Sequence, residues 1–230
     1  MVTSGYAPIV RATKRLFPLA KELAYRLHVN LGFFPRYHYM YSPAQLAFLC
    51  QCISDVEPVD GTILEVGSAF GNTTVFLNEH MRCSGIERPY VCIDTFSGFM
   101  QRDLEDEISA RGRRPPGQAF RTNKQKWVQR TLEVNQATGV MLYEADAVSF
   151  DYNEVGPIAF CLIDVDLYLP VKSVLDRVFD LVPNGGRIVV DDCGKLDQAW
   201  EGAYEAYREF VQERDLPQRI VLDKLGVIDK

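Results

Sequence analysis

Short apolar runs alternate with longer amphipathic segments along most of the chain. Beyond residue 60 each apolar run is four to seven residues long, and the segments between them carry apolar residues at helical spacing. Strands that are apolar on both faces and alternate with helices are typical of a mostly parallel sheet that is covered on both sides. We therefore predict a Rossmann-like, doubly wound α/β fold. The predicted strands are residues 62–66, 90–94, 140–144, 158–164, 187–191 and 219–222, and the predicted helices lie near 71–80, 123–137, 170–182 and 197–214.

The first 58 residues follow a different pattern, which predicts helices alone. Residues 8–29 have apolar positions at near-helical spacing, interrupted by Pro18. The segment from Ser42 to Gln45 has the features of a helix start, because serine can cap, the following proline suits the first helical position and glutamine can complete a capping box. We expect an N-terminal helical extension over residues 1–58 and the main domain over residues 59–230.

One polar segment interrupts the alternation of strands and helices. Residues 97–121 follow the second predicted strand and contain three glycines and two consecutive prolines, Pro115 and Pro116. A long connection without strong periodicity is often a lid or a substrate loop. We therefore predict that residues 97–121 form a lid or substrate insertion.

Charge and composition narrow the classes of function. The net charge is −6, but residues 1–41 carry a net +5, so the remainder carries −11. An acidic body disfavours nucleic acid as the principal ligand. No apolar run approaches the roughly 20 residues that span a bilayer. We expect a cytoplasmic protein without a membrane partner, and the basic first segment leaves a targeting role open.

Each of the first five predicted strands ends at an acidic residue. In open α/β sheets, ligands bind beyond the carboxyl ends of the strands. Acids at all five ends therefore predict a polar site along this edge of the sheet. These acids are Glu65, Asp94, Glu144 with Asp146, Asp164 with Asp166, and Asp191 with Asp192.

The loop after the first strand predicts a binding site for a small ligand. Gly67 and Gly71 allow a tight turn and a close approach of the backbone to a ligand, at the start of a helix whose first N–H groups are free. A dinucleotide fingerprint would need glycine where Ala69 and Asn72 stand, so that interpretation fails. Asp94, 23 residues after Gly71, can accept hydrogen bonds from the hydroxyls of a ribose. A purely structural turn stays open as the alternative.

A second group of acids predicts a metal site. Asp191 and Asp192 follow Asp164 by 27 and 28 residues, which is one α/β unit, and Asp166 stands beside them. Carboxylates crowded into one cleft repel each other unless a cation neutralises them. Oxygen ligands favour a hard cation such as Mg²⁺, Mn²⁺ or Ca²⁺. The alternative is a strand-end polar group at Asp164 and a helix cap at Asp191 and Asp192.

Four motifs taken together resemble a known enzyme family. The segment from Glu65 to Gly71 resembles the first motif of class I S-adenosylmethionine-dependent methyltransferases. With the segments 94–99, 164–168 and 183–192, it resembles the macrocin O-methyltransferase family, over roughly residues 60–195. That resemblance implies a metal-dependent enzyme which uses S-adenosylmethionine to methylate hydroxyls on sugars of natural products.

The resemblance also implies roles for individual residues. Gly67, Ser68 and Gly71 would hold the methionine moiety, Asp94 the ribose, and Asp146 would lie near the adenine. The cofactor residues predicted in this way are Glu65, Gly67, Ser68, Gly71, Thr73, Asp94, Thr95, Phe96, Asp146 and Asp164. The predicted metal ligands are Asp164, Asp191 and Asp192, and the predicted catalytic residues are Asp164 and Asp166, the latter as general base.

The expected function is therefore divalent-metal-assisted, S-adenosylmethionine-dependent O-methylation of a small-molecule hydroxyl, on a sugar or another natural product. The expected cofactors are S-adenosylmethionine and Mg²⁺ or another divalent cation, the acceptor is the expected partner, and a homo-oligomer is left open. Two alternatives remain. A metal-dependent nucleotide-sugar transferase could use Asp164 and Asp166, although it gives the glycine loop no role, and a cofactor-binding module could lack catalysis.

Overall fold

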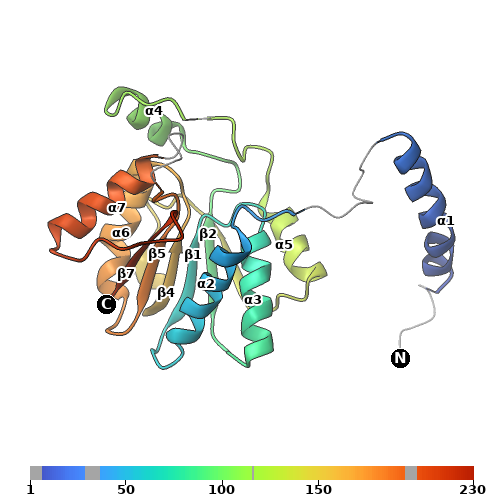
Figure 1. Ribbon diagram of the computed structural model, residues 1–230, viewed down its shortest axis with the longest axis horizontal. Coiled ribbons are helices and arrows are strands. Elements are labelled where there is room, and N and C mark those ends of the chain that lie inside the picture. Colours follow the sequence, from blue (N-terminus) through green and yellow to red (C-terminus); the bar gives the residue numbers. More distant parts are fainter. Residues whose placement is uncertain (1–6, 29–36, 116, 195–200) are drawn as a thin grey trace. The chain divides into compact units, whose positions relative to one another are not determined.

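The computed structural model describes residues 7–28, 37–115, 117–194 and 201–230, and it divides the chain into two compact units, Met1–His38 and Tyr39–Lys230. The described part of the first unit contains one helix, α1 (Ala7–Arg26), where the spacing of apolar residues predicted one (Figure 1). Within the described ranges, none of the helices combines the length and the apolar character that crossing a bilayer requires.

The second unit begins at Tyr39, ahead of the expected boundary near residue 59. The physical reason is helix α2 (Pro43–Asp55), whose side chains Leu46 and Leu49 are buried in the core of this unit. The predicted capping box at its start is confirmed. Ser42 Oγ accepts a hydrogen bond from the Gln45 N–H at 3.3 Å, and the Ser42 N–H donates to the Gln45 side chain at 2.7 Å.

A seven-stranded sheet forms the centre of the second unit, in the order β3-β2-β1-β4-β5-β7-β6. The strands β1 to β5 run parallel, and β7 pairs antiparallel with both β5 and β6. The mostly parallel, Rossmann-like fold is confirmed. The strands are β1 (Thr62–Val66), β2 (Tyr90–Asp94), β3 (Val140–Glu144), β4 (Ile158–Ile163), β5 (Arg187–Val190), β6 (Ile220–Val221) and β7 (Leu225–Asp229).

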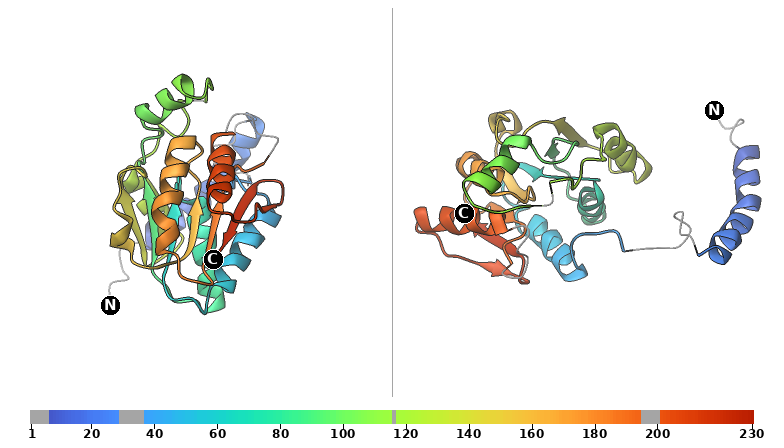
Figure 2. Two further views of the ribbon diagram at one scale, coloured as in Figure 1. Left: turned by 90° about the vertical axis from the view of Figure 1, so that its left-hand side faces the viewer. Right: turned by 90° about the horizontal axis from the view of Figure 1, so that it is seen from above.

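Helices cover both faces of the sheet (Figures 1 and 2). On one face, α2 packs on α3 (Asn72–Ser84), and α5 (Gln125–Val134) lies beside α3; on the other face, α6 (Tyr168–Val178) packs along α7 (Glu201–Glu213). Successive strand residues point to opposite faces, so β1 sends Ile63 into the α2–α3 core and Leu64 into the α6–α7 core. The central strands are therefore apolar on both sides.

Two elements differ from the sequence-based expectation. The insertion 97–121 contains a helix, α4 (Gln101–Ser109), which lies above the carboxyl edge of the sheet (Figure 1). Strand β7 follows β6 after a three-residue turn, and its residues up to Ile228 are buried. The sequence pattern missed β7 because two short strands so close together do not form a separate periodic run. The predicted helix 197–214 is observed as α7, and residues 195–200 lie outside the described part of the chain.

Candidate functional site

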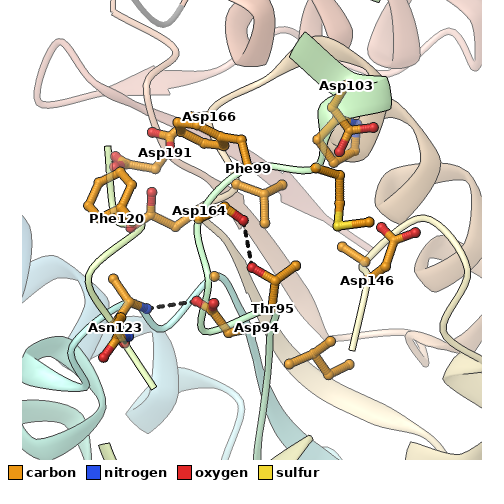
Figure 3. Close-up of a pocket in the computed structure, with 18 of the residues that line it drawn as sticks. Asp94, Thr95, Phe99, Asp103, Phe120, Asn123, Asp146, Asp164, Asp166 and Asp191 are labelled. Carbon is orange, nitrogen blue, oxygen red and sulfur yellow. Dashed lines mark hydrogen bonds between the residues drawn. The ribbon is translucent and has the colours of Figure 1, made fainter. Parts of the chain in front are cut away.

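A pocket of about 270 Å³ opens at the carboxyl edge of the sheet, where the sequence predicted a site (Figure 3). Of the predicted residues, Gly67, Asp94, Thr95 and Asp146 line one part of it, and Asp164, Asp166, Asp191 and Asp192 line another. The structure thus brings residues from five strand ends into a single cavity. Glu65, Ser68, Gly71, Thr73 and Phe96 lie nearby but outside the lining.

The glycine loop is shaped by contact with the end of β4. Gly67 has φ +92°, and a Cβ placed on it would fall 1.8 Å from the carbonyl oxygen of Asp164. Glycine is therefore required here by a backbone-to-backbone approach as well as by the left-handed conformation. The next residue, Ser68, has a buried hydroxyl without a hydrogen-bond partner among the described residues. An unpartnered buried hydroxyl beside a pocket is available to a ligand.

Asp94 connects the glycine loop with the loop after β2. Its Oδ2 accepts a hydrogen bond from the Ala69 N–H at 2.8 Å, which is the dashed line at Asp94 in Figure 3. Its Oδ1 accepts one from the Phe96 N–H at 2.6 Å. Burial raises the pKa of Asp94 in spite of these donors. Each carboxylate oxygen has two acceptor positions, so the side chain retains room for a ligand hydroxyl.

Glu65 points away from the pocket. Its side chain is buried, and Oε2 accepts hydrogen bonds from Thr74 Oγ1 and from the Tyr90 hydroxyl, each at 2.7 Å. Burial raises the pKa of Glu65 from 4.5 to about 7. In this structure Glu65 therefore ties the first turn of α3 to β2, which positions the glycine loop from behind.

Asp146 is paired with a residue of the insertion that the sequence did not single out. Arg102 on α4 donates to both carboxylate oxygens of Asp146, at 3.1 Å each, and also contacts Asp103 at 2.8 Å. Burial opposes the charge of Asp146, but Arg102 and the Val148 N–H outweigh it and lower the pKa of this carboxyl. The ion pair fastens α4 to the end of β3 at the mouth of the pocket.

Other parts of the insertion form the wall of the pocket. Phe99, Met100 and Phe120 line it, and Phe99 and Phe120 pack edge to face with their ring centroids 5.9 Å apart. Asn123 is buried, and its Nδ2 donates to the carbonyl oxygen of Ala69 at 2.6 Å. The polarity and length of residues 97–121 pointed to this region, but no local signal identified these residues.

Four aspartates form the acidic cluster of the pocket: Asp164, Asp166, Asp191 and Asp192. Asp166 and Asp192 are hydrogen-bonded to each other through their side chains. Burial, together with repulsion from Asp192, raises the pKa of Asp164 to about 6, although Lys224 opposes this. Burial and the neighbouring carboxylates raise the pKa of Asp166 and Asp191 well above their usual range. The cluster therefore holds more negative charge than it can keep without a cation or a proton.

The backbone at the acidic cluster is strained. Asp166 has φ +63° and Asp192 has φ +54°, both in the left-handed region that non-glycine residues rarely adopt. Such conformations cost of order 1–3 kcal/mol each and persist only where the surroundings enforce them. The two strand ends thus turn both carboxylates toward the pocket at an energetic cost.

Lys224 contacts the acidic cluster and was not identified by the sequence analysis. Its Nζ lies 2.6 Å from Asp191 Oδ2 and 3.2 Å from Asp192 Oδ1, and 4.7 Å from the ring centroid of Tyr41. The Tyr41 hydroxyl in turn donates to Asp164 Oδ2 at 2.8 Å. Although burial disfavours its charge, the aspartates raise the pKa of Lys224, so the ammonium stays protonated.

The acidic cluster has the donor atoms that a divalent metal prefers, but its side chains are not arranged around a common centre. Asp191 Oδ1 is buried without a hydrogen-bond partner, and carboxylate oxygens are the ligands that hard cations prefer. In the described ranges, however, no three acidic, histidine or cysteine side chains are arranged closely enough to enclose an ion. The carboxylate oxygens therefore suit a divalent cation, and in this structure the ammonium of Lys224 supplies the positive charge beside them.

Comparisons with known structures agree with this fold. Calicheamicin methyltransferase CalS11 superposes with a TM-score of 0.67 at 21% identity, covering 100% of this chain and 94% of that chain. The O-methyltransferase NovP gives a TM-score of 0.70 at 18% identity, covering 85% of this chain and 83% of that chain. The O-methyltransferase from Bacillus cereus, in complex with SAH, gives a TM-score of 0.55 at 16% identity, covering 95% of this chain and 91% of that chain.

These identities establish the fold alone, and a search of curated proteins gave no match. The family itself comes from the sequence. The sequence model of the family described as Macrocin-O-methyltransferase (TylF) matches residues 33–229, which is nearly the whole chain. The protein therefore belongs to the macrocin-O-methyltransferase family and is an O-methyltransferase-family enzyme.

Proposed function

We propose that this protein transfers the methyl group of S-adenosylmethionine to a hydroxyl of a small molecule, a sugar or another natural product. The observation that carries the proposal is a single pocket with a glycine loop on one side and four aspartates on the other. One of the structures with the same fold is described as a TDP-rhamnose 3'-O-methyltransferase, which supports a sugar acceptor.

The cofactor would lie against the glycine loop. The close approach at Gly67, the unpartnered hydroxyl of Ser68 and the spare acceptor positions of Asp94 suit the polar methionine and ribose parts. The adenine would lie toward Asp146, between the end of β3 and the aromatic wall of the insertion. This placement directs the methyl group toward the acidic cluster.

The chemistry needs alignment and a base. Methyl transfer is an in-line displacement in which the acceptor oxygen forms a bond to the methyl carbon while the carbon–sulfur bond breaks, leaving S-adenosylhomocysteine. The acceptor proton would pass to the carboxylate of Asp166, which lines the same pocket as Asp164. Asp164 would support this step from the end of β4.

A divalent cation, Mg²⁺ or a similar ion, belongs to the same proposal. Asp164, Asp191 and Asp192 would hold it, and the unpartnered oxygen of Asp191 together with the crowding of charge supports that assignment. When bound there, the cation would lower the pKa of the acceptor hydroxyl. The residues of the chain would position the acceptor and accept its proton.

Calorimetric titration tests the cofactor and metal together. S-adenosylmethionine and S-adenosylhomocysteine should each bind with and without Mg²⁺, since the methionine end does not need the metal. Incubation with nucleotide-sugar and glycoside acceptors should then give products heavier by one methylene unit, and excess chelator should stop turnover but not cofactor binding. Absence of cofactor binding would remove the methyltransferase assignment, and full turnover in chelator would remove only the metal.

A further inference from the structure

The side chain of Lys224 contacts one oxygen of each of two carboxylates that the proposed metal would use. Its ammonium contacts Asp191 Oδ2 at 2.6 Å and Asp192 Oδ1 at 3.2 Å, and both carboxylates are among the most buried acids of the described chain, with side chains 3% and 6% exposed. A magnesium ion binds carboxylate oxygen at about 2.1 Å. An ammonium and a divalent ion on the same two carboxylates would repel each other at short range, so the presence of either one weakens the binding of the other.

The backbone of Lys224 is held firmly, so only its side chain can yield. The turn between β6 and β7 places Leu222 and Asp223 in the left-handed region, with φ +54° and +55°. The Cys193 N–H donates to the Lys224 carbonyl oxygen at 2.7 Å, and a Cβ on Gly194 would fall 2.2 Å from the Asp223 carbonyl oxygen. The turn is therefore packed against the chain segment that follows β5.

The side chain itself has a path out of the cluster. It is 24% exposed, whereas the carboxylates that it contacts are buried. Lysine carries its charge on a flexible four-carbon stem, so rotation of that stem moves the ammonium without moving the backbone. The ammonium lies 4.7 Å from the ring centroid of Tyr41.

We propose that Lys224 is a built-in cation of the acidic cluster, which a divalent metal must displace, and that it thereby weakens metal binding and keeps the cluster stable when metal is scarce. The inference rests on the metal assignment of the proposed function. It follows from the two ion pairs, the unpartnered oxygen of Asp191 and the fixed turn that carries Lys224. Lys224 acts here through the aspartates and is a positioning residue.

The test replaces the charge but keeps the length of the side chain. In calorimetry, Lys224→Met should bind Mn²⁺ or Mg²⁺ roughly tenfold more tightly than the natural protein, because the ammonium that repels the metal ion is gone. Lys224→Arg keeps the charge and should show no gain. Lys172→Met is the matched control, because Lys172 pairs with Glu209 and Glu213 on the surface between α6 and α7.

A second measurement tests whether Lys224 stabilises the protein when no metal is bound. In chelator, Lys224→Met should melt at a lower temperature than the natural protein, and saturating Mg²⁺ should restore its melting temperature. Adding Asp191→Asn to Lys224→Met should abolish both the metal binding and the restoration. Circular dichroism confirms that each variant is folded at the temperature of the titration.

The outcomes separate the two levels of inference. Tighter metal binding by Lys224→Met alone supports displacement. Equal or weaker metal binding by that variant, with the metal still bound by the natural protein, overturns the role of Lys224 but leaves the metal site. If neither protein binds metal while both bind S-adenosylmethionine, the metal part of the proposed function fails, and the displacement fails with it.

Discussion

The backbone of Gly67 lies against that of Asp164, so closely that a Cβ on residue 67 would sit 1.8 Å from the Asp164 carbonyl oxygen. This contact joins the end of β1, which begins the glycine loop, to the end of β4, which begins the acidic cluster. The two halves of the candidate site are therefore held in register by backbone contact. Any side chain at residue 67 would push the proposed cofactor and acceptor regions apart.

Gly67→Ala should be much more costly than a comparable substitution elsewhere. We expect a loss of about 3 kcal/mol or more in the free energy of unfolding, from overpacking added to left-handed strain. Gly85→Ala is the control, because Gly85 also has positive φ but its Cβ would meet nothing within 4 Å, so about 1 kcal/mol is expected there. Denaturant unfolding measures both, and equal losses would contradict the steric argument.

The stability of the protein should depend on pH through Glu65. Its pKa is about 7 when folded and near 4.5 when unfolded, so between these values the folded state holds a proton that the unfolded state has lost. This contribution is fully present below pH 4.5 and is lost as pH rises through 7, up to about 3 kcal/mol. As pH rises over this range, the natural protein should therefore lose free energy of unfolding relative to Glu65→Gln, whose side chain does not ionise. A pH-independent difference would show that Glu65 ionises normally.

Asp94→Ala should weaken the binding of S-adenosylmethionine. Loss of one or two hydrogen bonds to a charged group costs roughly 1.5–3 kcal/mol each. The glycine loop would also lose the hydrogen bond that its Ala69 N–H donates to Asp94. Asp151→Ala is a suitable control. Asp151 accepts hydrogen bonds from the backbone N–H and the side chain of Asn153, but it caps a short helix and does not line the pocket. Unchanged affinity in calorimetry would remove Asp94 from the site.

Asp166→Asn should reduce the rate of methyl transfer and leave cofactor binding intact. Removing a general base usually lowers the rate by about 100- to 10,000-fold. Asparagine keeps the size of the side chain at a position with φ +63°, which asparagine tolerates well, so the fold should be retained. Single-turnover kinetics give the rate of the chemical step. A rate within a few-fold of the natural enzyme would assign the proton transfer to another group.

The insertion should respond to ligands through Arg102. Its two hydrogen bonds to Asp146 fasten α4 at the mouth of the pocket, so Arg102→Ala should speed hydrogen exchange over residues 97–121 in the free protein. Cofactor with acceptor should protect the same segment in the natural protein. Arg130→Ala, which removes a surface pair with Glu133 on α5, should leave exchange there unchanged. Identical exchange in free and bound protein would exclude a lid.

The local pattern of the sequence was enough to predict most of the fold. Strands β1, β2 and β3 have the predicted bounds. In β1 and β2 the apolar residues are buried on both faces of the sheet, as is typical of a covered parallel sheet. The capping box at Ser42 was also recognisable, since its partners are three residues apart. The acids at the strand ends predicted the place of the site, because parallel strands bring their carboxyl ends to one edge.

Only the tertiary structure decided which side chains meet at that edge. Lys224 reaches Asp191 across 33 residues, and Arg102 reaches Asp146 across 44, through contacts that no local periodicity encodes. Glu65 turns into the core rather than the pocket because the pleat of β1 directs alternate side chains to opposite faces. The sequence by itself determined the parallel strands β1 to β5 and the acidic edge, since both follow from local apolar patterns and strand direction. The partners of each acid depended on how distant segments pack together.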